Sequence, residues 1–333
     1  MNIWKDGIMG VVVGDALGCP VQFESRDEVI EHPIIGMRGY GTFNLPAGSW
    51  TDDSALTLAL LDSILRKGGI DCADIMENFV KWLDGGAFTP FGYSFDIGFG
   101  TMSAIRRYKA EGDPFTCGGR DARNCGNGSL MRILPAALYC HEQGLPADEA
   151  IDIIHKVGSL THGHIRTNIA CGLYGFLVEA ILDGNGALKD RLQAGFEKGF
   201  AFYEATPGEA EELRHFDRLR DVDAFAATHV DDIRSTGYAV ATLEAAIWAL
   251  LNEHSFEDTL LRAVNLGDDT DTVGAVAGGL AGLYYGYDGI PGEWLAEIQR
   301  RAWIEELCDA AGNKLYQIPS NPYTTAGVFS ALA

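Results

Sequence analysis

The feature that most constrains the fold of this chain is a nearly continuous series of helical periods. Apolar residues recur at helical spacing, and alternating strand patterns are scarce. Residues 53–69 and 71–86 show the pattern most clearly, because each segment ends in a pair of glycines. Further amphipathic stretches lie near residues 96–110, 129–143, 147–158, 166–183, 187–204, 237–253, 256–265, 270–286 and 291–301. The sequence therefore predicts an all-α protein.

The same pattern bears on the number of domains. Residues 184–232 are the most charged part of the chain, but the helical periods on both sides of them keep the same style. We therefore predict a single domain over residues 1–333, with residues 184–232 as a peripheral helical excursion. Hydrophobic residues make up 47% of the chain, which is enough to bury a sizeable core. The proline-broken residues 317–333 are expected to wrap around the surface.

The charge and the cysteines limit the classes of function and compartment. The chain has 25 Lys and Arg against 47 Asp and Glu, a formal net charge of -22, which disfavours the coating of nucleic acids. Its seven cysteines are scattered, as is typical of reduced thiols in the cytoplasm. We expect no signal peptide and no membrane span, because the longest apolar run, residues 273–287, is shorter than the roughly 20 residues that a span needs.

Two acidic clusters stand at the heads of apolar helical segments, over 200 residues apart. The first is Thr51, Asp52 and Asp53, and the second runs from Asp269 to Thr272. Helix capping accounts for either cluster taken alone, but one cap requires only one side chain. The extra carboxylates must be solvated, paired or bound to a cation. Oxygen ligands suit Mg²⁺ or Mn²⁺, and the lack of His and Cys in the clusters disfavours zinc. Residue chemistry slightly favours metal binding, although spacing alone does not show that the clusters converge.

Four glycines recur every fourth residue after the second cluster: Gly274, Gly278, Gly282 and Gly286. On a helix this spacing places them in one stripe, although each glycine costs about 1 kcal/mol relative to alanine. Another backbone is therefore expected to come very close to this helix. The contact is interpreted as ordinary tight packing, as the device that brings the two acidic helix heads together, or as both.

A glycine- and asparagine-rich loop and a histidine pair are further candidates. The loop, residues 118–135, opens into a predicted helix at about Ser129, and its N–H groups are suited to a pyrophosphate, although such loops are usually only turns. His162 and His164 are spaced by two residues and so do not share a helix face. His162 is interpreted as a satisfied turn residue or as a group that contacts a ligand. No nucleophile elbow is present.

Six segments together resemble the ADP-ribosylglycohydrolase family. They occur in the family's order between residues 10 and 282, and they are GVVVGDALGCPVQF (10–23), WTDDS (50–54), FDIGFGT (95–101), NGSLMRILP (127–135), LTHGH (160–164) and LGDDTDTVGAVAGGLAG (266–282). The resemblance implies an orthogonal bundle of helices with a central dinuclear cleft for two Mg²⁺ or Mn²⁺ ions. It also implies hydrolysis of the glycosidic bond between ADP-ribose and an acceptor, such as an arginine of a protein or a small-molecule substrate.

The resemblance also assigns roles to individual residues of this chain. The metal ligands would be Thr51, Asp52, Asp53, Asp269, Asp271 and Thr272. ADP-ribose would lie against the loop at residues 124–128, with His162 nearby and Asp96 toward the leaving group. The residues of that loop taken to bind substrate are Asn124, Gly126, Asn127 and Gly128.

Gln22 departs from the family pattern, because some relatives have a metal-associated catalytic glutamate at this position. Glutamine can hold a water molecule but cannot take its proton. The base would then be an aspartate such as Asp53 or Asp269, or else Glu24, which is more simply interpreted as a surface carboxylate. Two alternatives to the hydrolase therefore stay open: a non-catalytic ADP-ribose-binding protein that kept the fold, and a dinuclear hydrolase of another ribosyl or nucleotide substrate.

Overall fold

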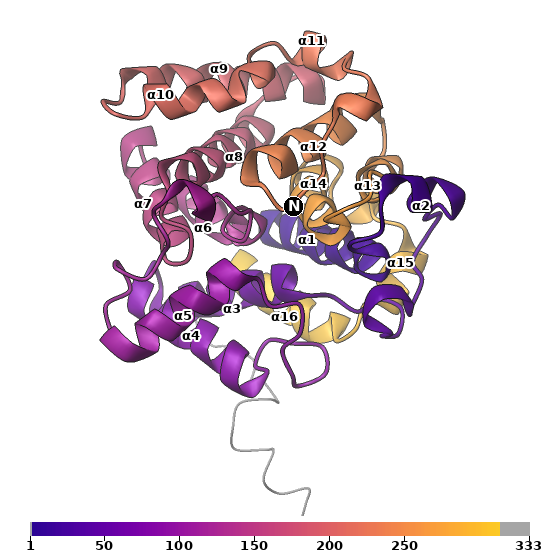
Figure 1. Cartoon of the computed structure of the whole chain (residues 1–333), viewed down its shortest axis with the longest axis horizontal. Helices are drawn as coiled ribbons and strands as arrows, with labels where there is room; N and C mark the ends of the chain where they lie inside the picture. Colours follow the sequence, from indigo (N-terminus) through magenta and orange to yellow (C-terminus); the bar gives the residue numbers. More distant parts are fainter. Residues whose placement is uncertain (1, 314–333) are drawn as a thin grey trace, which may run out of the picture.

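All regular elements of the chain within residues 2–313, which are the residues that the computed structural model describes, are helices (Figure 1). No β-strand occurs in this range, where only two isolated bridges form. The helices are α1 (Ile3–Gly18), α2 (Arg26–Glu31), α3 (Asp52–Lys67), α4 (Cys72–Gly85), α5 (Phe99–Glu111), α6 (Leu134–Glu142), α7 (Ala147–Ser159), α8 (Ile165–Asp183), α9 (Leu188–Ala205), α10 (Ala210–Leu213), α11 (Val222–Ala226), α12 (Ala239–Asn252), α13 (Phe256–Val264), α14 (Thr270–Tyr285), α15 (Gly292–Glu297) and α16 (Arg301–Gly312). The all-α prediction is confirmed. Residues 317–333 lie outside the described range.

The antiparallel pair α1 and α14 lies at the centre of the molecule (Figure 1). A Cβ atom added at Gly278 would overlap the carbonyl oxygen of Gly10, and one at Gly274 would overlap that of Gly14. The backbone predicted to approach the glycine stripe is therefore that of α1. Gly286 lies outside this contact, because it ends α14 and a Cβ atom there would meet no other atom within 4 Å.

Sequence periodicity did not predict α1, although it is the central helix. Its residues are buried on every face from Gly7 to Gly18, so it has no polar side from which a helical period can be recognised. Its glycines have the same function as those of α14. Gly18 lies against the backbone of Thr270 and Asp271, so the C-terminal end of α1 touches the head of α14.

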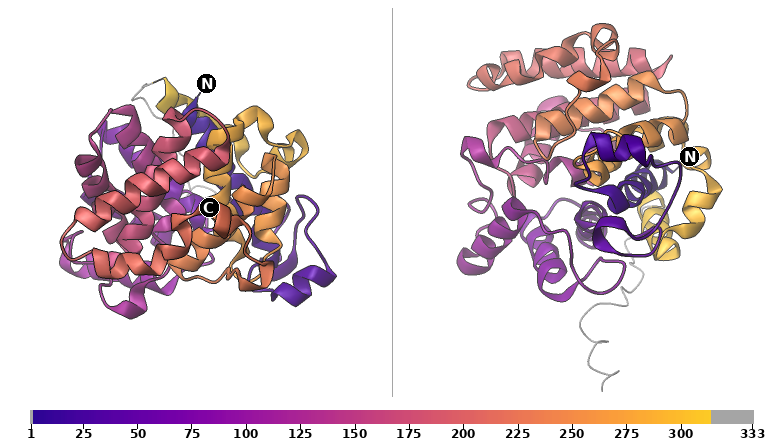
Figure 2. Two further views of the ribbon diagram at one scale, coloured as in Figure 1. Left: turned by 90° about the horizontal axis from the view of Figure 1, so that it is seen from above. Right: turned by 45° about the vertical axis from the view of Figure 1, so that its right-hand side comes forward.

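The remaining helices surround this pair and share its core. In Figure 1, α3, α4, α5 and α16 lie below the central pair, and α9, α10 and α11 form an outer layer above α8 and α12; the right panel of Figure 2 shows the same layer. Residues 184–232 supply that outer layer. The buried hydrophobic residues of the described range form one connected cluster that includes residues of both α1 and α16.

Two predicted helices differ from the observed ones. The helix expected at 129–143 begins with a 3₁₀ turn, Leu130–Arg132, and α6 starts only at Leu134, with Pro135 in its first turn. The helix expected at 291–301 is two helices, α15 and α16. The helical conformation is interrupted before α16, where the backbone of Arg300 has a φ of 55°.

Helix α8 is long and apolar enough to cross a membrane by length and composition, with a mean hydropathy of 1.3 over its most apolar window. It lies within the helical body, where it contacts α7, α9, α12 and α14. Of that window, 61% is buried inside the protein. The core therefore accounts for the apolar composition of α8.

Candidate functional site

The heads of α3 and α14 meet, although 219 residues separate the side chains that join them. The hydroxyl of Thr272 lies 3.4 Å from Asp53 Oδ2 and 3.3 Å from Asp269 Oδ1. The two acidic clusters that the sequence set far apart thus form one group of carboxylates.

Helix capping accounts for only a small part of this group. Thr51 is the N-cap of α3 and accepts a hydrogen bond from the backbone N–H of Asp53. Asp269 occupies the N-cap position of α14 but accepts no capping hydrogen bond. The carboxylates of Asp52 and Asp53 therefore have no capping function that would explain their presence in the interior.

Asp15 of α1 holds the head of α3 from the other side. Its side chain is fully buried and accepts hydrogen bonds from the N–H groups of Thr51 and Ser54, each at 3.0 Å, and from the Ser54 hydroxyl at 2.6 Å. Sequence reasoning did not single out Asp15. The signal was present, because Asp15 is the only charged residue between Gly7 and Gly18.

Amide side chains hold the carboxylates that face the solvent side of the group. Gln22 Nε2 donates to Asp96 Oδ2 at 2.9 Å and lies 3.5 Å from Asp269 Oδ1. Asn127 Nδ2 donates to Asp269 Oδ2 at 2.7 Å and to the Thr242 hydroxyl at 2.9 Å. Asp269 is thus oriented by two amides and by the hydroxyl of Thr272.

The electrostatics of the group are unfavourable without a cation. Burial raises the pKa of Asp52, Asp53 and Asp271 well above the usual range, and the neighbouring carboxylates raise it further. Burial also raises the pKa of Asp15 to about 7, even though the hydrogen bonds from Ser54 and Thr51 favour its charged form. A bound cation would stabilise the charged forms of all four side chains.

Two oxygen atoms of the group have no partner. Asp53 Oδ1 and Asp271 Oδ2 are buried and accept no hydrogen bond. Buried carboxylate oxygens without a donor are costly, so these two atoms fit a hard cation that takes oxygen ligands. No group of three or more His, Cys, Asp or Glu side chains within residues 2–313 is already arranged around a single ion position. The fit therefore rests on charge and on the two unpaired oxygens.

A cavity of about 250 Å³ opens onto this group. It is lined by Gln22, Phe23, Asp52, Asp96, Gly98, Phe99, Gly100, Thr101, Gly126, Asn127, Gly128, Met131, His162, Gly237, Asp269 and Thr272. The glycines leave room for the imidazole of His162, since a Cβ atom at Gly100 or Gly128 would come within 2.7 Å of its ring. Polar groups and bare backbone thus face the same space.

His162 presents a ring nitrogen to this cavity. Arg132 donates a hydrogen bond to the Thr161 hydroxyl at 2.8 Å, and that hydroxyl lies 2.9 Å from His162 Nδ1. Burial, with a smaller contribution from the charge of Arg132, lowers the pKa of His162 to about 3, so the ring is neutral near pH 7. Its Nε2 is the ring nitrogen nearest to Gly100 and Gly126.

The structure separates the predicted site residues into three sets. Asp52, Asp96, Gly126, Asn127, Gly128, His162, Asp269 and Thr272 line the cavity, as does Gln22. Thr51, Asp53 and Asp271 are buried beside it. Asn124 and Glu24 are absent from the lining: Asn124 ends the 3₁₀ turn Ala122–Asn124 and lies against Gly119. The N–H of Asn127 donates to the Gly237 carbonyl, so it is not free for a phosphate.

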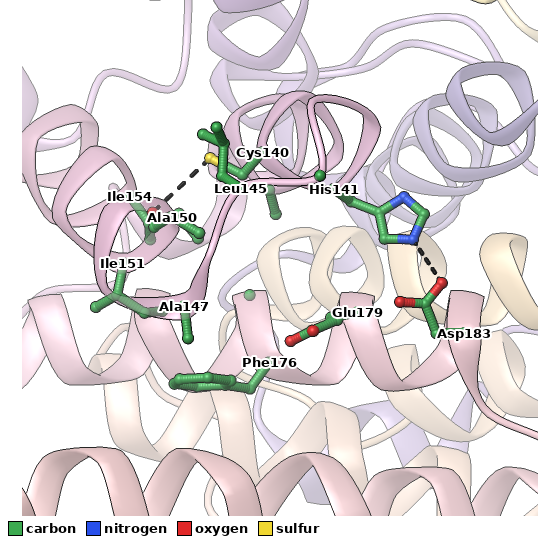
Figure 3. A pocket seen from close by; sticks show the side chains of 13 residues that line it. Cys140, His141, Leu145, Ala147, Ala150, Ile151, Ile154, Phe176, Glu179 and Asp183 are labelled. Carbon is green, nitrogen blue, oxygen red and sulfur yellow. Dashed lines mark hydrogen bonds and ion pairs between the residues drawn. The ribbon is translucent and has the colours of Figure 1, made fainter.

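A second cavity, of about 390 Å³, lies between α6, α7 and α8 (Figure 3). Its walls combine apolar side chains, among them Ile151, Ile154 and Phe176, with polar groups. The polar groups at one end are His141 and Asp183, joined at 2.9 Å. This cavity offers no group of uncompensated charges.

The fold and the site define an all-helical protein whose two acidic helix heads meet beside a cavity lined by amides and glycines. Residues 4–322 match the family model described as ADP-ribosylglycohydrolase, so the chain belongs to the ADP-ribosylglycohydrolase family. The resemblance seen in the sequence is confirmed.

Several relatives match over most of their length. The chain is 33% identical to the ADP-ribosylarginine hydrolase Tri1 of Pseudomonas putida (strain GB-1), over 94% of this chain and 79% of the relative. It is 33% identical to the ADP-ribosyl-[dinitrogen reductase] glycohydrolase of Rhodospirillum rubrum, over 88% of this chain and 89% of the relative. A solved structure titled ADP-ribosylglycohydrolase-related protein complex matches with a TM-score of 0.75 at 32% identity, covering 94% of this chain and 98% of that one.

Proposed function

We propose that this protein hydrolyses the glycosidic bond between ADP-ribose and an arginine side chain of a protein. The observation that carries the proposal is the convergence of the two acidic helix heads beside the cavity, in a chain that belongs to the ADP-ribosylglycohydrolase family. The names of two relatives, an ADP-ribosylarginine hydrolase and a dinitrogen reductase glycohydrolase, support a protein acceptor and arginine in particular.

The donor set suits two divalent cations of the Mg²⁺ or Mn²⁺ type. The residues that would hold them are Thr51, Asp52, Asp53, Asp269, Asp271 and Thr272. All are oxygen donors, and the unpaired oxygens of Asp53 and Asp271 support this assignment. Such ions, when bound, supply the positive charge that activates a water molecule and orients sugar hydroxyls.

Asp269 is the better placed of the two candidate bases. It lines the cavity, whereas Asp53 lies beside it and is almost fully buried. In this proposal a water molecule adds to the anomeric carbon as the bond to the arginine nitrogen breaks, and its proton passes to Asp269. The guanidine nitrogen leaves with the bonding electron pair and takes up a proton. The hydrogen bonds from Asn127 and Gln22 fix the direction in which that carboxylate faces.

Gln22 cannot be the base, but its position gives it another function. Its amide nitrogen is directed at Asp96 and Asp269, while its Oε1 is buried without a partner. This oxygen is free to accept a hydrogen bond from a water molecule or from a substrate hydroxyl. Gln22 therefore positions groups in the cavity and accepts no proton.

The test is the release of ADP-ribose by the purified protein with Mg²⁺ or Mn²⁺. Substrates linked through arginine, serine and nucleic acid are compared by chromatography. Asp269→Ala and Asp52→Ala are expected to abolish release from the arginine-linked substrate. The matched control is Asp148→Ala, which removes an exposed aspartate from the first turn of another helix, α7. No release from any of the three substrates would sink the proposal.

Gln22 also favours a second function, a non-catalytic ADP-ribose-binding protein. Its amide stands between Asp96 and Asp269 and supplies no carboxylate. Calorimetry distinguishes the two functions, because tight binding of ADP-ribose without turnover would favour the binding protein. Robust turnover would exclude it.

A further inference from the structure

Four exposed aromatic side chains belong to segments that line the acidic cavity or are tied to those that do. They are Phe99, Phe23, Tyr40 and Tyr93, with 78%, 67%, 66% and 52% of their surface accessible, and we call them the aromatic rim. Phe23 and Phe99 line the cavity themselves. Scattered exposed apolar residues are normal on a protein surface, but a cluster beside a functional cavity indicates a surface that binds something.

Three loops that support the site also form the rim. The rings of Phe43 and Phe95 lie 5.4 Å apart, and those of Phe95 and Tyr93 lie 6.2 Å apart, so the loop that contains Tyr40 and the loop that contains Tyr93 are joined. The hydroxyl of Thr42 donates to the Gln22 carbonyl at 2.7 Å, which ties the loop of Tyr40 to that of Phe23. The rim is one connected structure, continuous in the chain with Gln22 and Asp96.

Two of the four rim residues have an unusual backbone conformation. Phe23 and Tyr40 both take a φ of 69°, a conformation that is rare for bulky side chains. Backbone hydrogen bonds hold both residues in this conformation. The N–H of Phe23 donates to the carbonyl oxygen of Asp268 at 2.6 Å, and the N–H of Tyr40 donates to the carbonyl oxygen of Leu45 at 2.5 Å. Each such residue costs of order 1–3 kcal/mol and persists where the surroundings fix it, most often at functional sites.

Charge limits what can cover the rim. With a net charge of -22 the chain repels acidic partners at long range and attracts basic ones. Arginine and lysine side chains bind well over aromatic faces, and exposed aromatic residues are frequent anchors of protein interfaces. A nucleic acid meets the same repulsion as any other acidic partner.

We propose that the aromatic rim docks the protein that carries the ADP-ribosyl group, through basic side chains next to the modified arginine. This inference rests on the proposed hydrolase function, since the rim surrounds the cavity into which the modified residue would enter. Docking through Tyr40 and Tyr93, which do not line the cavity, adds affinity for a macromolecular substrate and contributes nothing to a free ADP-ribosylated amino acid.

The test compares two substrates of the holoenzyme: lysozyme, a basic protein, ADP-ribosylated on arginine, and free ADP-ribosyl-arginine. The double variant Tyr40→Ser with Tyr93→Ser changes rim residues that do not line the cavity. It is expected to raise KM for the modified lysozyme at least tenfold while kcat stays the same. Turnover of free ADP-ribosyl-arginine is expected to stay within twofold of the wild type.

Phe115→Ser is the matched control. Phe115 is 51% exposed, close to the value for Tyr93. It follows the C-terminal end of α5, whereas the rim residue Phe99 begins that helix, and the 13 residues of α5 span about 20 Å. This variant is expected to leave both substrates unaffected.

Three outcomes would overturn the docking proposal. An equal loss on both substrates would make the rim part of the subsite for the small ligand, no loss on modified lysozyme would remove any docking function, and an equal loss in Phe115→Ser would make the effect nonspecific. A wild type that hydrolyses neither substrate would contradict the hydrolase function instead. In that case the rim is tested by surface plasmon resonance in the Asp269→Ala background. The docking proposal requires the double variant to weaken binding of modified lysozyme tenfold and to leave binding of free ADP-ribose unchanged.

Discussion

Two of the cavities of this protein differ in size and in charge, and only the smaller one adjoins a group of buried carboxylates. The larger, of about 390 Å³, has both polar and apolar walls, and its acidic residues are paired: Asp183 with His141 at 2.9 Å and Glu179 with Lys198 at 2.6 Å. The smaller, of about 250 Å³, adjoins buried carboxylates that raise one another's pKa. Uncompensated buried charge, and not volume, identifies the functional cavity.

The largest expected difference between the cavities is in turnover. Asp269→Ala removes the carboxylate that two amides orient in the smaller cavity, and it is expected to lower kcat about 10³-fold, the range for loss of a general base. The measurement is the initial rate of ADP-ribose release with saturating Mn²⁺. A rate within tenfold of the wild type would assign the base to another residue.

A smaller effect is expected at Asp15, which touches α3 but does not line the cavity. Asp15→Asn keeps the size of the side chain but offers one acceptor oxygen to the N–H groups of Thr51 and Ser54, where the carboxylate offers two. Groups that orient metal ligands typically contribute 10–100-fold to affinity, so calorimetry should show Mn²⁺ binding weakened by about that factor. Unchanged affinity would limit Asp15 to a contribution to folding.

The pH dependence of the stability of the metal-free protein tests whether burial of the Asp271 carboxylate is electrostatically unfavourable. Burial raises the folded-state pKa of Asp271 above its unfolded value, so metal-free protein loses the contribution of this group as the pH rises from about 4 toward neutrality. Asp271→Asn cannot ionise and escapes this loss. In EDTA, the melting temperature of the variant relative to the wild type should therefore increase from pH 4 to pH 8.

Added Mg²⁺ provides the control for that experiment. Because bound metal compensates the charge, it should raise the melting temperature of the wild type at pH 8 more than that of Asp271→Asn. If the difference in melting temperature between the two proteins did not change with pH, burial of the Asp271 carboxylate would not be electrostatically unfavourable.

The smallest expected effect belongs to the larger cavity. Ala150→Leu enlarges a side chain that lines the larger cavity (Figure 3), so ADP-ribose release should stay within twofold of the wild type. Stability should change by less than about 1.5 kcal/mol, because the space is open to receive the added atoms. A large loss of turnover would show that this cavity is coupled to the site.

The parts of the site that lie close together in sequence could be predicted from it. Thr51, Asp52 and Asp53 are consecutive, and their excess of carboxylates over capping needs is visible in the chain itself. The meeting of Asp53 with Thr272 could not be predicted in this way, because it depends on how α1 packs between the two segments. Spacing predicted that a backbone would approach the stripe that contains Gly278, but nothing in the stripe identifies α1 as that partner.

Three other features could not be predicted from sequence patterns. The N-terminal helix α1 has no polar face, so periodicity could not reveal it. Asn124 was expected at the cavity because the family resemblance assigned the whole loop at residues 124–128 to ADP-ribose, but it ends a 3₁₀ turn and lies near Gly119. The hydrogen bond from Arg132 to Thr161, next to His162, spans 29 residues of sequence, so the surroundings of this histidine are known only from the folded structure.

The contact between α1 and α14 has a consequence for how precisely the carboxylates are spaced. Gly10 and Gly14 touch Gly278 and Gly274 directly, so the separation of the two helices is fixed by main-chain atoms, which have no alternative rotamers. The relative positions of Asp15 and Asp271 therefore do not depend on side-chain rotamers, which exchange more often in ordinary cores as the temperature rises. Substitutions among the surrounding leucines and valines can accumulate without altering the site. A single methyl group added at one of these four glycines would displace both helix heads.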